Sequence, residues 1–592
     1  MLSGSLFPRA WQRLTVHCSG NGHCVNTTRT RHLSTYSLLE NKKSKLVWLL
    51  FPCIFFGGYG VFKFTKYSED YFNQINPSIK KEKIVIVGSS WGAVSCLRRL
   101  DLNKFDVTVV SPLNYFLFTP GLPDAVAGVV KVESITEPIR NFVKSDRFHF
   151  FEASVTSINH HSKYLECSPV SGCDPFKLEY DKLILAIGSV PNYLDVKNAV
   201  QYSLPLYGLV DSIKIRNEII SRLERANLPN TGDEEKRKLL HLVVVGGSPV
   251  SSNLVANLHD YLKSDIDKIY PHLSRYLRIT MVHTKAHIRN FYDKTISDNM
   301  YNYFCREGTE VLFATVIKSI SKNSITAEIS DPLISGTKCI DIPFGICIWT
   351  VGPSLHPLLK KFHDIVTIQN NEHALVCDPA LRVKGVEDVF AVGDCATIAQ
   401  DYILQKFDDI LNRADLNKDG SIDLNEYHHL ISKMALVYPA IKAFDSQIFH
   451  KFDIDSSQKL SVDEFKQFLV YAEHTLTRFP QTATVAFQQG DFLARHLNKG
   501  SYEQGQPNVP GKAELPKFPE FKYKHLGGYE YVGAEQGILP RGSKGQSIFS
   551  GIGAIWMWKA VYFSKMIPMN VRFNLLYDWL HTYAFGSRAK KI

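Results

Sequence analysis

The chain has 592 residues, of which 45% are hydrophobic and 21% charged, a composition typical of a globular protein with room for about four domains of roughly 150 residues. Its formal net charge of +10 lies partly at the N-terminus and partly near the C-terminus, without a compact basic stripe interleaved with aromatics, which argues against nucleic-acid binding and favours targeting and an anionic membrane surface. The 11 cysteines include no C-x-x-C pair, which argues against a disulfide framework and a metal cluster.

Residues 1–40 have the composition of a mitochondrial transit peptide, because they contain arginines and many Ser and Thr but no acidic residue before Glu40. A disordered tail is the alternative. Residues 46–62 are uncharged and just reach the length of about 17 residues that a membrane-spanning helix needs. They predict a transmembrane or membrane-anchor helix, which would leave the body of the chain in the intermembrane space. A re-entrant or interfacial segment is the alternative.

Residues 83–93, KIVIVGSSWGA, predict a strand, a tight turn at Gly88 and the start of a helix. Backbone N–H groups at such a helix start can hold a pyrophosphate. Ser90 replaces the second glycine of the G-x-G-x-x-G/A pattern, so a plain buried strand and turn fits this segment equally well. The same pattern returns at residues 242–254, LVVVGGSPVSSNL. Two such units predict two dinucleotide-binding lobes and an enzyme that passes electrons between two cofactors. Residues 105–111 predict a second parallel strand of the first lobe.

Two acidic loops between residues 401 and 474 have the ligand spacing of EF-hands. The first, DLNKDGSIDLNE, predicts calcium ligands at Asp415, Asn417, Asp419, Ser421, Asp423 and Glu426. An acidic loop that binds no metal ion is the alternative. The second, DIDSSQKLSVDE, offers Asp453, Asp455, Ser457, Lys459, Ser461 and Glu464, the lysine through its carbonyl group. Its turn position is Gln458 instead of glycine and it has fewer carboxylates, so we expect weaker binding or a purely structural role. Apolar residues at helical spacing flank both loops.

The C-terminal stretches 548–567 and 571–585 mix Trp, Tyr and Phe with Lys and Arg. Aromatic residues with interspersed cations are typical of an interfacial helix lying on anionic lipid. A buried dimer helix is the alternative.

Nine ordered segments resemble those of a type II (alternative) NADH dehydrogenase of the inner mitochondrial membrane, specifically the external kind with an EF-hand insertion. The resemblance covers nearly all of residues 83–592. The segments are IVIVGSSWGA, SPLNYFLFTPGLP, SITEPIR, YDKLILAIGSVPN, LLHLVVVGGSPV, IPFGICIWTVG, VFAVGDCATI, TATVAFQQG and FKYKHLGG.

The resemblance implies an α/β fold with two Rossmann-like dinucleotide-binding domains, an inserted all-α EF-hand pair and a C-terminal membrane-associated helical region. The implied domains are an FAD-binding domain in two parts (83–237 and 351–400), an NAD(P)H-binding domain (238–350), the EF-hand pair (401–474), an FAD and quinone segment (475–510) and a membrane-binding and dimerisation region (511–592).

The resemblance also implies three sets of site residues. For FAD these are Gly88, Ser89, Ser90, Gly92, Ala93, Ser111, Asn114, Thr119, Pro120, Ala186, Gly188, Gly393 and Asp394. For NAD(P)H they are Gly246, Gly247, Ser248, Pro249, His283 and Gly352, and for the quinone Thr484, Gln488, Lys524 and His525. Asp394 would accept hydrogen bonds from the FAD ribityl chain; the alternative is that it only caps a turn. For TATVAFQQG the alternative to a quinone site is an ordinary helix face.

The nicotinamide site departs most from the family pattern G-G-G-P-T-G-V-E, because Ser248, Ser251 and Asn253 replace two glycines and the carboxylate. At the end of the next strand, ITMVHT, His283 stands where an acidic residue is expected. Without that carboxylate the site loses its main means of rejecting a 2′-phosphate, and Lys285 nearby favours one. NADPH use, or low activity, is therefore a hypothesis.

The resemblance implies that electrons pass from NADH, or NADPH, through FAD to ubiquinone without proton pumping and without a catalytic protein nucleophile, modulated by Ca²⁺, in a homodimer on inner-membrane lipid. One alternative is a degenerate, calcium-responsive structural or assembly paralogue, favoured by Ser90, Leu113, Ser248, Ser251, Asn253, His283 and Thr484. A second alternative is an FAD-dependent reductase with a soluble acceptor, which would not need the aromatic and basic C-terminal helices.

Overall fold

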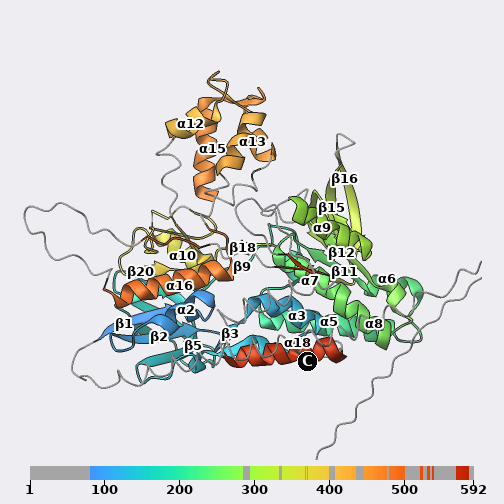
Figure 1. The fold of residues 1–592 in the computed structure, drawn as a ribbon, viewed down its shortest axis with the longest axis horizontal. Helices are drawn as coiled ribbons and strands as arrows, with labels where there is room; N and C mark the ends of the chain where they lie inside the picture. The colour runs from blue at the N-terminus through green and yellow to red at the C-terminus, as the bar shows by residue number, and fades with distance from the viewer. Residues whose placement is uncertain are drawn as a thin grey trace, which may run out of the picture. The chain divides into compact units, whose positions relative to one another are not determined.

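The computed structural model describes most of the chain beyond residue 80 (Figure 1). The described residues are 81–284, 294–331, 336–366, 368–369, 371–398, 407–434, 444, 446–475, 479–500, 520–524, 530–533, 536–538 and 569–585. The predicted transit peptide, the predicted anchor over 46–62, Lys285, His525 and residues 548–567 lie outside them. Within these ranges no helix is both long and apolar enough to cross a bilayer.

The first large sheet has seven strands in the order β20-β8-β1-β2-β5-β6-β7. Strands β20, β8, β1, β2 and β5 are parallel, and β6 and β7 continue the sheet in antiparallel fashion. The strands predicted at 83–87 and 105–111 are confirmed as β1 and β2, which pair with Ile84 opposite Val107. The bounds are β1 (Glu82–Val87), β2 (Phe105–Ser111), β5 (Phe148–Asn159), β6 (Tyr164–Pro169), β7 (Phe176–Glu179), β8 (Lys182–Leu185) and β20 (Val389–Ala391).

Both faces of β1 are buried, which explains its continuous apolar run. Ile84 and Ile86 join the core formed with helices α2 (Trp91–Arg99) and α16 (Ala483–Asn498). Val85 and Val87 join the core beneath α10 (Pro357–Ile365).

Helices α2 and α16 lie side by side along this sheet (Figure 1). They approach closely because both contribute glycines, and a side chain at Gly490 would overlap the carbonyl oxygen of Gly92. Residues that follow the EF-hand segment in the sequence are thereby packed against the first glycine-containing turn.

The second large sheet is fully parallel, in the order β10-β17-β11-β12-β13. Its strand β11 and helix α7 confirm the second strand–turn–helix unit. The strands are β10 (Leu204–Pro205), β11 (His241–Val245), β12 (Arg278–Val282), β13 (Glu310–Leu312) and β17 (Ile346–Trp349). The associated helices are α4 (Ala199–Tyr202), α5 (Leu209–Ala226), α6 (Asp233–Leu239), α7 (Pro249–Asn257), the π-helix η4 (Leu258–Lys263), α8 (Ser264–Ile269) and α9 (Lys294–Arg306).

Residues 315–343, for which the sequence motifs predict nothing, contribute a three-stranded antiparallel sheet. Its strands are β14 (Thr315–Ile320), β15 (Ser324–Asp331) and β16 (Gly336–Pro343). The shorter described elements are β3 (Tyr115–Leu117), α3 (Leu122–Ala127), β4 (Thr136–Pro138), β19 (Leu375–Cys377), β21 (Ala396–Ile398), β24 (Glu530–Gly533), β25 (Gln536–Ile538) and the 3-10 turns η1 (Thr119–Gly121), η2 (Val132–Ile135), η3 (Ile139–Asn141), η5 (Ser274–Tyr276) and η6 (Gly393–Cys395).

Two crossover segments join the large sheets and pair with each other. Strands β9 (Val190–Pro191) and β18 (Pro353–Ser354) form a two-stranded antiparallel ribbon. The N–H of Asn192 donates to the carbonyl oxygen of Gly352 at 3.1 Å. The indole of Trp349 in turn donates to the carbonyl oxygen of Asn192 at 2.9 Å. The two segments that cross between the sheets are therefore hydrogen-bonded neighbours.

The described part of residues 401–474 forms two helix–loop–helix units, as the spacing predicts. Strands β22 and β23 pair the two loops, with Ile422 opposite Leu460. Phe449, Phe465 and Phe468 lie in a hydrophobic cluster formed by this segment alone. The elements are α12 (Phe407–Ala414), β22 (Ile422–Asp423), α13 (Leu424–Met434), α14 (Ser446–Phe452), β23 (Lys459–Leu460) and α15 (Val462–Thr475).

Helix α18 (Met569–Phe585), part of the predicted membrane-binding and dimerisation region, packs partly against its own chain. Val571, Leu575 and Trp579 are buried in the core of the same chain. Asp578 accepts a hydrogen bond from the N–H of Lys131 at 2.8 Å. Phe573 and Tyr577, by contrast, are exposed. One face of the helix is thus occupied by the protein itself, and aromatics remain on another.

Candidate functional site

The carboxyl ends of parallel neighbouring strands meet at one edge of a sheet, where ligands of α/β proteins bind. In the first sheet, the segments after β1, β2, β8 and β20 meet there, and they carry most of the candidate FAD residues. Direct contacts join them. The Ser90 hydroxyl donates to the carbonyl oxygen of Ala186 at 3.0 Å, and the Ser111 hydroxyl donates to the Ser89 hydroxyl at 3.0 Å.

Gly88 forms the turn between β1 and α2. Its φ is +111°, and a Cβ at this position would overlap the carbonyl oxygen of Ala186. Ser90 is the N-cap residue of α2, yet its side chain makes no capping hydrogen bond. N–H groups of the first helical turn are therefore left for another acceptor, and this arrangement fits a pyrophosphate. Gly92 and Ala93 follow in the same buried turn.

The segment after β2 adds further candidate residues. The indole of Trp91, the first residue of α2, donates to the Thr119 hydroxyl at 3.0 Å. Thr119 and Pro120 open the short turn η1. Asn114 lies by Glu152, to which its amide donates at 3.5 Å. Trp91, which the sequence argument did not select, thus holds Thr119 at the start of α2.

Asp394 follows β20, with Gly393 before it at a φ of +80°. The residue is half-buried, and its carboxylate accepts a hydrogen bond from the Ser189 hydroxyl at 3.3 Å. Desolvation raises the pKa of Asp394, and the Ser189 hydrogen bond opposes that change. A carboxylate with one side-chain donor at this sheet edge fits a polyhydroxyl ligand such as a ribityl chain.

Two glutamines hold the turn that carries Asp394, and the motif search missed both. Gln489, which is 1% exposed, accepts a hydrogen bond from the N–H of Gly393 at 2.7 Å. The Gln481 amide donates to the carbonyl oxygen of Asp394 at 2.9 Å. The QQG sequence was a signal for Gln489, although it directed attention to its neighbour.

The second sheet repeats the arrangement at the ends of β11, β12 and β17. Gly246 has a φ of +135°, and a Cβ there would overlap the Thr350 hydroxyl. A Cβ at Gly247 would overlap the imidazole of His283, so this ring lies directly against the turn. Gly352 follows β17 in the crossover ribbon. The structure therefore brings the candidate NAD(P)H residues to one sheet edge.

The serines of the second turn satisfy each other. The Ser248 hydroxyl accepts from the N–H of Ser251 at 3.4 Å and so caps α7, which begins at Pro249. The Ser251 hydroxyl donates to the carbonyl oxygen of Ser248 at 2.7 Å. Asn253, in place of the family carboxylate, has a buried Oδ1 atom without a partner in the described residues. A phosphate at this turn would compete with the Ser248 hydroxyl for the N–H of Ser251. The first turn has no such side-chain cap.

Two of the candidate quinone residues, Gln488 and Lys524, are bonded to each other. Gln488 makes two hydrogen bonds to the backbone of Lys524, accepting from its N–H and donating to its carbonyl oxygen, each at 3.0 Å. The Thr484 hydroxyl lies 3.0 Å from that of Thr482. The Gln488 amide thus links α16 to the backbone of Lys524, a second candidate quinone residue.

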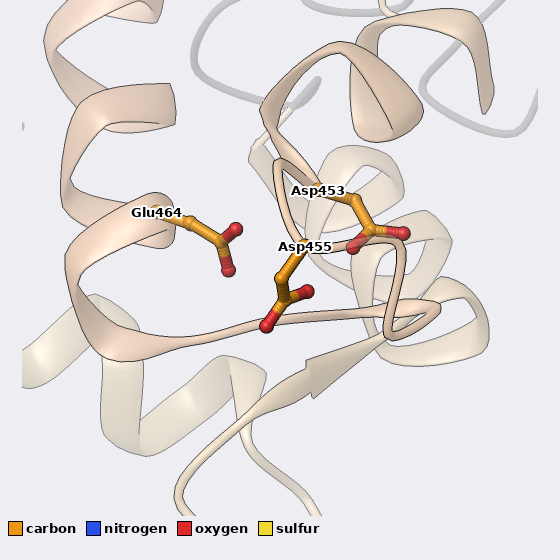
Figure 2. A group of neighbouring side chains, drawn as sticks. All are labelled: Asp453, Asp455 and Glu464. Carbon is orange, nitrogen blue, oxygen red and sulfur yellow. The ribbon is translucent and has the colours of Figure 1, made fainter.

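In the second EF-hand loop, three carboxylates gather around one point. Ligand atoms of Asp453, Asp455 and Glu464 all lie within 4.8 Å of one another (Figure 2). Gln458 has the positive φ, 61°, that its turn position requires. The Lys459 carbonyl accepts from the Ser457 hydroxyl at 2.9 Å, and Ser461 donates to Glu464 at 2.7 Å. Hard oxygen donors in this arrangement fit Ca²⁺.

The first loop has the more complete sequence, yet among the described residues it shows no such group of three carboxylates. Its candidate calcium-ligand oxygens accept hydrogen bonds from within the loop. Glu426 accepts from the N–H of Asp423 at 3.0 Å, and Asn417 accepts from the N–H of Asp419 at 2.8 Å. Asp415 accepts from the backbone of Asp419 and Gly420, and Ser421 donates to Asp419.

One carboxylate of the first loop is paired with a cation from the second. The Lys459 ammonium lies 2.6 Å from Oδ2 of Asp419. The β22–β23 pairing sets Lys459 opposite Asp423 and so directs this lysine toward the first loop. Lys459 was predicted to contribute a carbonyl ligand to its own loop, and its side chain adds a contact that spacing within one loop does not reveal.

Comparisons with known proteins agree with this geometry. Residues 82–417 match the pyridine nucleotide-disulphide oxidoreductase family, residues 525–588 an NDH2 C-terminal domain and residues 407–431 an EF hand. The chain is 31% identical over 539 residues to an external alternative NAD(P)H-ubiquinone oxidoreductase B1, mitochondrial, of Solanum tuberosum, covering 88% of this chain and 92% of that protein. It is 32% identical over 535 residues to the B4 protein of Arabidopsis thaliana, covering 87% and 90%.

Among solved structures, NDH2 from Plasmodium falciparum in complex with NADH matches with a TM-score of 0.68 and 26% identity, over 86% of this chain and all of that one. The matched family model spans more than half of the sequence, and the plant relatives match along most of it. The chain therefore belongs to the pyridine nucleotide-disulphide oxidoreductase family and, within it, to the type II, or alternative, NADH dehydrogenases.

Proposed function

We propose that the protein is an FAD-dependent oxidoreductase that passes electrons from NADH or NADPH to ubiquinone. The observation that carries this proposal is the pair of glycine turns, each at the carboxyl ends of parallel strands in one of the two large sheets. The β9–β18 ribbon joins the sheets, and Asp394 lies at the edge of the first. The printed names of the plant relatives, NAD(P)H-ubiquinone oxidoreductases, support the donor and the acceptor.

The chain's own residues would bind and orient the cofactors. The uncapped start of α2 would hold the FAD pyrophosphate, and Asp394 would accept hydrogen bonds from the ribityl hydroxyls. The FAD, when bound, supplies two-electron exchange between a nicotinamide and a quinone. Gln481 and Gln489 would fix the turn under that cofactor, and the crossover ribbon would keep the two sheet edges together.

The choice of nicotinamide depends on His283. An imidazole against the Gly247 turn, where the fold normally places a carboxylate, removes the negative charge that rejects a 2′-phosphate. We therefore propose that NADPH is accepted alongside NADH. The self-capped serines at Ser248 and Ser251 support weaker nucleotide binding than at the first turn.

We further propose that the protein binds Ca²⁺ and contacts a membrane. The donor sets of the two EF-hand loops support Ca²⁺ binding and modulation of activity. The exposed Phe573 and Tyr577 of α18 support contact with the inner mitochondrial membrane, and the relatives' names support the organelle. The homodimer and the orientation toward the intermembrane space stay proposals from the family resemblance.

A degenerate calcium-binding paralogue without catalysis is the second candidate. It is favoured by the satisfied serines of the second turn and by the unpartnered Oδ1 of Asn253. A turnover assay distinguishes the two candidates. Purified protein is mixed with a short-chain ubiquinone and either NADH or NADPH, with and without Ca²⁺. We expect a bound flavin that both nucleotides bleach, with quinone-dependent turnover. A bound flavin that neither nucleotide reduces would instead establish the paralogue.

A further inference from the structure

The turn of Gly393 and Asp394, here called the flavin turn, is held from two sides by hydrogen bonds to its backbone. Gln489 accepts from the N–H of Gly393 at 2.7 Å, and Gln481 donates to the carbonyl oxygen of Asp394 at 2.9 Å. Together they fix the peptide group that precedes Gly393 and the one that follows Asp394, so the turn is held at both of its ends.

The two glutamines belong to parts of the chain with different freedom. Gln489 is 1% exposed and lies on α16, which is packed against α2 through Gly92 and Gly490. Gln481 is half-buried and precedes the helix, whose N-cap is Thr482, the acceptor of the Val485 N–H at 3.4 Å. Because Thr482 already caps α16, Gln481 is not needed to start it.

The flavin turn is also where the EF-hand segment leaves and returns. Strand β21, which follows the flavin turn directly, ends at Ile398, just before that segment, and α15, its last helix, ends at Thr475, six residues before Gln481. Gln481, which follows the EF-hand segment, is thus hydrogen-bonded to the backbone of the flavin turn, which precedes that segment.

We propose that Gln481 is the positioning residue through which the calcium state of the EF-hand pair reaches the flavin turn, while Gln489 holds that turn regardless of calcium. The inference rests on the proposed function, in that FAD binds at Asp394 and Ca²⁺ in the loops. Binding of Ca²⁺ orders helix pairs, and a displacement of α15 reaches Gln481 through the short connection. Making or breaking its hydrogen bond rotates the Asp394 peptide and changes how the carboxylate meets the cofactor.

The test uses the full-length flavoprotein and two substitutions at one position. Gln481→Glu is nearly isosteric but removes the donor, and Gln481→Met removes it without adding charge. The control is Gln467→Glu, the same chemical change on the exposed face of α15. For each protein we would measure the FAD dissociation constant and the flavin midpoint potential with and without Ca²⁺, and the Ca²⁺ affinity by calorimetry.

We expect Ca²⁺ to change the FAD affinity of the unmodified protein and of the control by roughly two- to tenfold, the scale of one hydrogen bond. Both Gln481 variants should lose that response while their Ca²⁺ affinity stays within about twofold of the unmodified protein. Gln489→Leu should weaken FAD binding equally with and without Ca²⁺.

Three results would overturn the inference. Retention of the Ca²⁺ response in Gln481→Met would leave only a charge effect in Gln481→Glu. Absence of any response in an unmodified protein that binds both FAD and Ca²⁺ would also reject it, while the proposed redox function stands. A protein that binds no FAD after reconstitution would reject both.

Discussion

At the scale of single residues, Asp394 combines a carboxylate, one side-chain donor and a backbone fixed by two glutamines. If it accepts hydrogen bonds from FAD, Asp394→Asn should weaken FAD binding by roughly 10- to 100-fold, because hydrogen bonds to charged groups contribute about 1.5–3 kcal/mol. Flavin absorbance after gel filtration measures the retained cofactor. Asp491→Asn, which removes a surface partner of Arg99, is the control and should retain it.

His283 is the residue that we expect to set nucleotide preference. His283→Glu restores a carboxylate against the Gly247 turn and should lower kcat/KM for NADPH relative to NADH by about tenfold or more, since the carboxylate repels a 2′-phosphate. Thr284→Glu adds the same charge at an exposed neighbouring position. An equal change in both variants would mean that net charge, rather than position, determines the preference.

Lys459 competes with a calcium ion for Asp419. Its ammonium lies 2.6 Å from that carboxylate, so Ca²⁺ in the first loop must displace it or bind beside a positive charge. Lys459→Met keeps the backbone carbonyl and should raise Ca²⁺ affinity of the first loop by roughly three- to tenfold, the Coulomb scale for exposed charges. Calorimetry of this variant beside Lys466→Met, an exposed lysine of α15, checks it. Unchanged affinity would show that the ion pair carries no cost for calcium.

Local patterns in the sequence were sufficient for the glycine turns and the EF-hand loops, because their residues are close together in the chain. Gln489 and Gln481 are not accessible in this way, since they bond to residues 96 and 87 positions away. The Lys459 contact crosses 40 positions. Such contacts depend on helix packing and strand pairing, which no single motif specifies.

At the scale of elements, the second sheet and its neighbouring π-helix bury two histidines in neutral form. His241 begins β11 and bonds to Thr280 at 2.8 Å, and His259 on η4 bonds to Thr309. Burial lowers the pKa of each to about 4, with a smaller contribution from Arg278 for His241 and from Lys263 for His259. Unfolded imidazoles titrate near 6.5, so between these values the unfolded state binds more protons.

Stability of this region should therefore fall as pH is lowered from about 6.5 toward 4, by roughly 2 kcal/mol for each histidine at pH 5. Urea unfolding at pH 7.5 and pH 5, followed by Trp fluorescence, measures the difference. His241→Asn cannot titrate and should lose its share of the pH dependence, whatever its effect on stability at pH 7.5. A variant with the full dependence would contradict the assignment to His241.

Helix α18 shows what composition alone leaves open. Its aromatic and basic residues predict a lipid surface, but the structure buries Val571, Leu575 and Trp579 and bonds Thr582 to the carbonyl oxygen of Val129 at 2.7 Å. A helix with apolar residues on several sides can meet protein on one face and lipid on another. The buried contacts join it to residues more than 400 positions away, so periodicity did not indicate them.

At the scale of the whole molecule, the EF-hand pair has a hydrophobic cluster of its own, centred on Phe449, Phe465 and Phe468. The core around α2 and α16 includes no residue of that segment. A part of the chain with a separate core can unfold in a transition of its own.

Removal of Ca²⁺ should therefore act on one transition. Ligand present at 100 times its Kd stabilises the state that binds it by about 2.7 kcal/mol, so a chelator should lower the melting temperature of the EF-hand transition by several degrees and leave that of the flavin-binding core within about a degree. Differential scanning calorimetry with Ca²⁺ and with chelator separates the two. Glu426→Gln and Glu464→Gln, which replace the buried last ligand of each loop, should reproduce the chelator result in part. A single transition that shifts as a whole would show that the calcium unit and the flavin-binding core unfold together.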